Sequence, residues 1–110
     1  MNAINRRALP LAAAAMLVLG FAANAAEPNT VTISNFAFAP AILSVAPGAK
    51  VTWTNSDEEP HTVTSADGGL MFKSAALDTK DQFSFTFDKP GTYKYFCSIH
   101  PHMVGTIVVK

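Results

Sequence analysis

The segment "QFSFTFDKPGTYKYFC", residues 82–97, shows the clearest strand pattern in the chain. Phenylalanine stands at every second position before Pro90-Gly91, and two tyrosines and a cysteine stand at every second position after it. Alternation with a period of two places one set of side chains on a buried face and the other set in water. Because a Pro-Gly pair favours a turn, the segment predicts two successive strands joined by a tight connection.

Shorter runs of the same kind lie on both sides of this segment. The further strands are expected within residues 30–36, 41–46, 49–55, 61–66 and 105–110. Residues 70–80 are the least strand-like stretch, and we interpret them as a loop or a single helical turn. About seven short strands with regular turn signals predict an all-β sandwich or a small barrel.

The first 26 residues have a different composition. Arg6 and Arg7 precede an apolar run, which ends in the small residues Ala-Asn-Ala-Ala. These are the parts of a secretory signal peptide, and the run is short for a membrane span, which needs about 20 apolar residues. The sequence therefore predicts a signal peptide over residues 1–26, cleaved after Ala25 or Ala26, and a periplasmic domain over residues 27–110. An uncleaved membrane anchor is the alternative.

Charge and cysteine content limit what the mature part can do. It carries six lysines and eight acidic residues, a net charge of −2. No basic patch indicates nucleic-acid binding, and no later apolar stretch is long enough to span a membrane. Small exported domains often need a covalent or metal cross-link, and one cysteine cannot form an internal disulfide. A bound metal is one way to stabilise such a domain.

The stretch "CSIHPHM" after the strongest strand places Cys97, His100 and Met103 three positions apart. Pro101 has no N–H and disfavours a helical conformation at His100, so the stretch is expected to form a tight loop. His61 opens another strand much earlier in the chain. Packing of two sheets could bring all four side chains to one point, and such a set indicates a metal site.

The types of donor in this set narrow the choice of metal. Sulfur ligands favour Cu(I), imidazole suits Cu(II), and two histidines with one cysteine and a distant methionine form the blue-copper donor set. Two alternatives remain: Cys97 as a buried small hydrophobe, or as a nucleophile with His100 as its base. Met71 is a competing sulfur, which we expect at the surface, and His102 is expected to face solvent.

Three pieces of the chain resemble the cupredoxins, and the amicyanin branch in particular. They are "VTWTNSDEEPHTV", "FDKPGTYKYFCSIHPHM" and "VGTIVVK". The resemblance implies a cupredoxin-like Greek-key β-sandwich of about seven to eight strands that binds one copper ion. The ligands that it implies are His61, Cys97, His100 and Met103. It also implies that Asn55 supports the site by bonding near Ser98, so that the two ligand segments are tied together.

The same resemblance implies a one-electron carrier rather than an enzyme. Copper would cycle between Cu(II) and Cu(I), and protein partners would dock weakly near His100. In the family these are commonly an amine dehydrogenase as donor and a c-type cytochrome as acceptor, and we expect a monomer. Ile99 and His102 depart from the family pattern at the docking surface, so the partners cannot be carried over. The alternative function is copper storage or delivery in the periplasm.

Overall fold

The computed structural model describes residues 29–110, which form eight strands and no helix. The expected signal peptide, residues 1–26, lies outside the described residues, as do the first residues of the expected domain. Among the residues that are described, no helix has the length and apolar character needed to cross a membrane.

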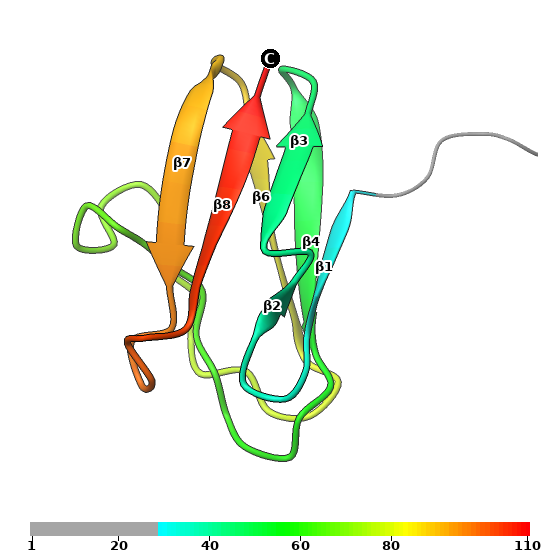
Figure 1. Ribbon diagram of the computed structural model, residues 1–110, viewed down its shortest axis with the longest axis vertical. Helices are drawn as coiled ribbons and strands as arrows, with labels where there is room; N and C mark the ends of the chain where they lie inside the picture. Colours follow the sequence, from blue (N-terminus) through cyan, green and yellow to red (C-terminus); the bar gives the residue numbers. More distant parts are fainter. Residues whose placement is uncertain (1–28) are drawn as a thin grey trace, which may run out of the picture.

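The strands form two four-stranded sheets, which pack against each other as a sandwich (Figure 1). The first sheet has the order β2-β1-β4-β6, with β2 at Phe38–Ala39, β1 at Thr30–Ile33, β4 at Ala49–Asn55 and β6 at Gln82–Phe87. The second sheet has the order β3-β8-β7-β5, with β3 at Ile42–Val45, β8 at Val104–Val109, β7 at Gly91–Phe96 and β5 at Thr64–Ser65. The predicted all-β sandwich is confirmed.

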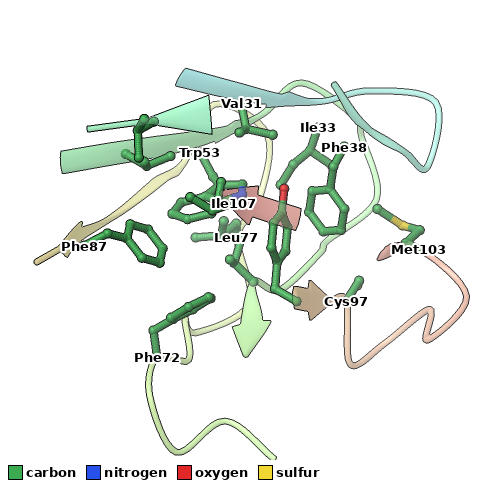
Figure 2. Close-up of a cluster of buried hydrophobic side chains, with 14 of the residues drawn as sticks. Val31, Ile33, Phe38, Trp53, Phe72, Leu77, Phe87, Cys97, Met103 and Ile107 are labelled. Atoms are coloured by element: carbon green, nitrogen blue, oxygen red, sulfur yellow. The ribbon is translucent and has the colours of Figure 1, made fainter. Parts of the chain in front are cut away.

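Aromatic side chains from both sheets fill the space between them (Figure 2). Trp53 of β4 is fully buried and meets Tyr95 of β7 edge to face, with 5.3 Å between the ring centroids. Phe87, at the end of β6, is also fully buried. Each such aromatic pair adds about 0.5–1.5 kcal/mol beyond the area that it buries. The period-two pattern of residues 82–97 therefore marked the inward faces of β6 and β7 correctly.

Gly105 lies within β8, directly opposite Tyr95 on β7. The Tyr95 ring lies against the Gly105 backbone so closely that any side chain at position 105 would overlap it. The smallest residue is therefore required in this strand by a close approach between neighbours.

Two short strands, one in each sheet, differ from the expectation. Within residues 61–66, only Thr64–Ser65 forms a strand, because His61 pairs with Leu77 of the irregular segment instead. The segment 70–80 is a loop without a helical turn, held by that pairing and by a bridge between Thr64 and Lys73. The two-residue strand β2 was not predicted, since it is too short to show a period.

The long loops between strands gather at the end of the sandwich opposite the C-terminus (Figure 1). They include residues 34–37 after β1, residues 56–63 after β4, and residues 97–103 between β7 and β8. His61 and Cys97 lie on these loops, so the topology places the candidate ligands at one end of the molecule.

We expect Tyr95→Phe to stabilise the protein. The Tyr95 hydroxyl and the Trp53 indole N–H are both buried, and neither has a hydrogen-bond partner by distance and angle. An unpaired buried hydroxyl costs about 1–3 kcal/mol, and removing it should raise the free energy of unfolding by about 1 kcal/mol in urea titrations.

The pH dependence provides a second measurement on the same residue. Burial raises the pKa of Tyr95 to about 12, whereas the unfolded chain titrates near 10. The folded state then holds one more proton between these values, so stability falls as the pH rises through this window. The Tyr95→Phe variant should therefore not show this fall in the free energy of unfolding between the two pKa values.

Tyr93→Phe is the control for the change in stability. It removes a 2.7 Å hydrogen bond to the Lys89 carbonyl, so the free energy of unfolding should fall instead of rising. Equal losses in both variants would contradict this account.

Candidate metal centre

Three of the predicted ligand atoms come together at the loop end of the sandwich. The Cys97 Sγ lies 3.8 Å from the His61 Nδ1 and 3.8 Å from the His100 Nδ1. All three atoms lie within 4.8 Å of one another. His61 and Cys97 are fully buried, whereas His100 is half-buried. The expected convergence of the early histidine with the later loop is confirmed.

The loop after β7 is closed by its own backbone. The Cys97 N–H donates to the Met103 carbonyl at 3.1 Å, and the Met103 N–H donates to the His100 carbonyl at 2.8 Å. Met103 is only 3% exposed, and Figure 2 shows its side chain at the same end of the hydrophobic cluster as Cys97. The predicted tight loop is therefore present, and it brings Cys97 and Met103 close together.

His61 is held on two sides. Its backbone exchanges hydrogen bonds with Leu77, at 3.2 Å and 2.7 Å. Its Nε2 lies 2.8 Å from a carboxylate oxygen of Asp57. The Nδ1 of the same ring therefore faces Cys97, while the opposite nitrogen is anchored in the loop.

Thr62 joins the two ligand segments. Its backbone N–H donates to the Cys97 Sγ at 3.3 Å. Its hydroxyl oxygen accepts the Ser98 N–H at 2.8 Å and lies 2.9 Å from the Ser98 hydroxyl. An N–H directed at the sulfur stabilises the thiolate, which is the form that binds metals.

The expected bond between Asn55 and Ser98 is wrong. The Asn55 amide donates to the Glu59 carbonyl at 2.9 Å and to the Leu77 carbonyl at 2.8 Å, and its oxygen accepts the Asp57 N–H at 2.9 Å. Both amide N–H groups and one lone pair of the oxygen are thus engaged within the loop that carries His61, and no bond reaches the segment at Ser98. Asn55 supports the loop that carries His61, whereas Thr62 makes the connection to Ser98.

Phe36 covers both histidines from the loop after β1. Its ring meets the rings of His61 and His100 edge to face, with centroid distances of 5.2 Å and 5.0 Å. Asn35 and Phe36 both adopt positive φ angles, and their N–H groups donate to the Asp57 carboxylate. The carboxylate thus stabilises a backbone conformation that few residues adopt without support.

The remaining candidates lie where the sequence suggested. His102 is exposed, and Met71 is 38% exposed on the loop near Asp67. Asp57, Thr62 and Phe36 are the contributors that sequence reasoning missed. Only Asp57 and Thr62 had a signal, which was their closeness to His61 in the chain.

Hydrogen bonds keep the Asp57 carboxylate charged. Burial alone would raise the pKa of Asp57, but the N–H groups of Phe36 and Asn35, together with His61, bring it below its ordinary value. The carboxylate is therefore ionised at neutral pH and lies against the buried His61 ring.

The spacing of the three donors fits a single ion. A zinc-sized ion lies about 2.3 Å from a sulfur and about 2.0–2.1 Å from a nitrogen, and at trigonal angles of about 120° it separates the two atoms by about 3.7–3.8 Å. Both sulfur-to-nitrogen distances have this value. A thiolate with two imidazoles is a donor set that suits copper. Fold and site together define a small β-sandwich with a copper centre.

Comparison with known proteins agrees with this class. The family profile described as "Cupredoxin-like domain" matches residues 8–109. Amicyanin-alpha from Methylorubrum extorquens is 34% identical over 88 residues, which cover 77% of this chain and 74% of the relative. A solved oxidised amicyanin variant matches with a TM-score of 0.69 and 32% identity, covering 81% of this chain and 89% of that one. A purple cupredoxin from Nitrosopumilus maritimus matches with a TM-score of 0.68 and 34% identity, covering 74% and 98%.

The chain belongs to the cupredoxin family and is amicyanin-like within it. Its cofactor is copper. It belongs among the electron carriers of this family.

We expect Thr62→Val to lower the stability of the metal-free protein by about 2 kcal/mol. The variant keeps the shape of the side chain but removes the acceptor of the Ser98 N–H and leaves the buried Thr64 hydroxyl without a partner. An unpaired buried polar group costs about 1–3 kcal/mol. Thr64→Val is the matched control, because the Thr64 hydroxyl bonds only the Thr62 hydroxyl, at 3.0 Å. Urea unfolding should show a clearly smaller loss for the control, and equal losses would argue against the cross-link.

Proposed function

We propose that this chain is a periplasmic carrier that moves one electron at a time through a bound copper ion. The observation that carries the proposal is the meeting of the Cys97 sulfur with the imidazoles of His61 and His100, at distances that fit one trigonal ion. Copper in such a site supplies a centre that accepts and releases one electron. We assign His61, Cys97 and His100 as its close ligands and Met103 as the axial ligand.

The protein's part in this function is to keep the ligands still. Cys97 and Met103 are fixed by the bonded loop, and His61 by Leu77 and Asp57. A mixed set of sulfur and imidazole donors is acceptable to both Cu(I) and Cu(II). Little rearrangement is then needed when the electron arrives or leaves, which suits a carrier.

The burial of the site supports an electron carrier over the two alternatives, which are an enzyme and a copper storage or delivery protein. His61, Cys97 and Met103 are 0–3% exposed, so neither a substrate nor a receiving copper protein could reach the ion directly through them. Residues 29–110 contain one group of three or more His, Cys, Asp or Glu side chains that could hold a metal.

Electrons would enter and leave through His100. It is the half-buried member of the cluster, and exposed apolar side chains surround it: Phe36 at 41% and Ile99 at 45% exposure, with Pro101 also exposed. A small apolar patch favours brief contacts, which a carrier needs in order to leave its partner. We propose protein redox partners here, a dehydrogenase as donor and a c-type cytochrome as acceptor.

Copper titration of the metal-free protein tests the function. One equivalent of Cu(II) should produce an intense visible charge-transfer band, and the band should disappear and return on reduction and reoxidation. Cys97→Ser should remove the band, because the thiolate provides the charge that is transferred. A colourless complex that loses its copper to a mild chelator would favour storage or delivery instead.

Met103→Leu tests the axial assignment. The variant should still bind copper, but its reduction potential should rise, since the axial ligand tunes the potential of such sites. Met71→Leu is the matched control, because that methionine lies on the surface. Spectroelectrochemical titration measures both variants, and an unchanged potential for Met103→Leu would exclude it as the axial ligand.

A further inference from the structure

The Asp57 carboxylate lies behind the metal centre, where it contacts two backbone N–H groups and one imidazole nitrogen. Its Oδ1 accepts the Asn35 N–H at 2.7 Å, and its Oδ2 accepts the Phe36 N–H at 2.9 Å. The same Oδ2 lies 2.8 Å from the His61 Nε2. The carboxylate side chain is 11% exposed, and the imidazole is fully buried. One anionic group therefore contacts the buried imidazole and the loop that covers it.

We propose that Asp57 is a positioning residue that sets the tautomer of His61 and biases the bound copper toward Cu(II). The inference rests on the proposed function, since it concerns the same centre. A ring that donates Nε2–H to a carboxylate has an unprotonated Nδ1, and Nδ1 is the atom that faces Cys97. The other tautomer would place a lone pair against the carboxylate and a proton between the ring and the sulfur.

The negative charge of Asp57 favours Cu(II) over Cu(I) in the bound ion. A metal-bound histidine that donates its other N–H to a carboxylate becomes a stronger electron donor to the ion. The contact lies against a fully buried ring, where electrostatic interactions are stronger than in water. A negative charge stabilises Cu(II) more than Cu(I), because Cu(II) carries the higher charge. Asp57 therefore lowers the reduction potential.

The carboxylate also controls the position of Phe36. Its bonds to the N–H groups of residues 35 and 36 hold both in left-handed conformations, which seats the Phe36 ring against both imidazoles. A change in the Phe36 cover would also alter solvent access to the centre, which affects the potential of a bound ion. The tautomer of His61 is therefore the measurement that separates the positioning role from the loop-holding role.

The test is Asp57→Asn in the copper-loaded protein, with Asp67→Asn as the matched control. Asp67 also holds a loop, through Ser65, Leu70 and Met71, and makes no hydrogen bond to the histidines of the centre. Both variants remove one negative charge. At a fixed applied potential, Asp57→Asn should shift the Cu(II)/Cu(I) ratio about tenfold toward Cu(I), a rise of about 59 mV for one electron. Its affinity for Cu(II) should fall about 10–100-fold, and Asp67→Asn should change neither.

Equal potentials in the two variants, or equal losses of Cu(I) and Cu(II) affinity in Asp57→Asn, would overturn the bias toward Cu(II). The tautomer is measured in the unmodified, metal-free protein by long-range ¹H–¹⁵N spectra at pH 8. A protonated Nε2 on His61 is expected, and a protonated Nδ1 would overturn the proposal. This spectrum requires neither copper nor a folded variant. A failure of the chain to bind copper would instead overturn the proposed function and leave the tautomer result standing.

Discussion

The hydrogen bonds between Thr62 and residues 97–98 are the contact on which the metal centre depends. They join two segments 35 positions apart in the chain, one leading to His61 and the other opening the ligand loop. The sandwich brings the loops to one end of the molecule, and the pairing of Thr64 with Phe96 aligns the two segments beside the ligands. The Thr62 bonds then fix the Cys97 sulfur directly against the segment that carries His61.

The aromatic core below the site makes this contact rigid. Tyr95 lies two positions before Cys97 on β7 and packs between Trp53 and Phe38, with centroid distances of 5.3 Å and 4.7 Å. A close-packed interior resists displacement of its side chains. Strand β7, which ends at Phe96 directly before Cys97, is therefore fixed by packing from the first sheet. The same burial leaves the Tyr95 hydroxyl and the Trp53 indole N–H without hydrogen-bond partners, so close packing here costs two unpaired polar groups.

The sequence predicted those parts of the structure that have a local pattern. Period two identified β6 and β7, and Pro101 identified the tight loop that holds His100. The Asn55–Ser98 bond was predicted wrongly, because the position of Asn55 does not reveal that three nearby backbone groups already occupy its side chain. The role of Phe36 could not be predicted, since its contact with His61 depends on the left-handed conformation of Asn35 and Phe36 in the loop between β1 and β2.

The two imidazoles of the centre are held in different ways, and the difference suits a carrier. His61 is fully buried, and the nitrogen that faces away from Cys97 lies against Asp57. The His61 ring is therefore held in place when the charge of the ion changes. His100 is half-buried in a short loop beside Ile99 and Pro101, where a partner can approach. An ion held by one anchored and one accessible ring keeps its geometry while electrons pass on the open side. Phe36 touches both rings, and so it limits the movement of the accessible ring without shielding it from the surface.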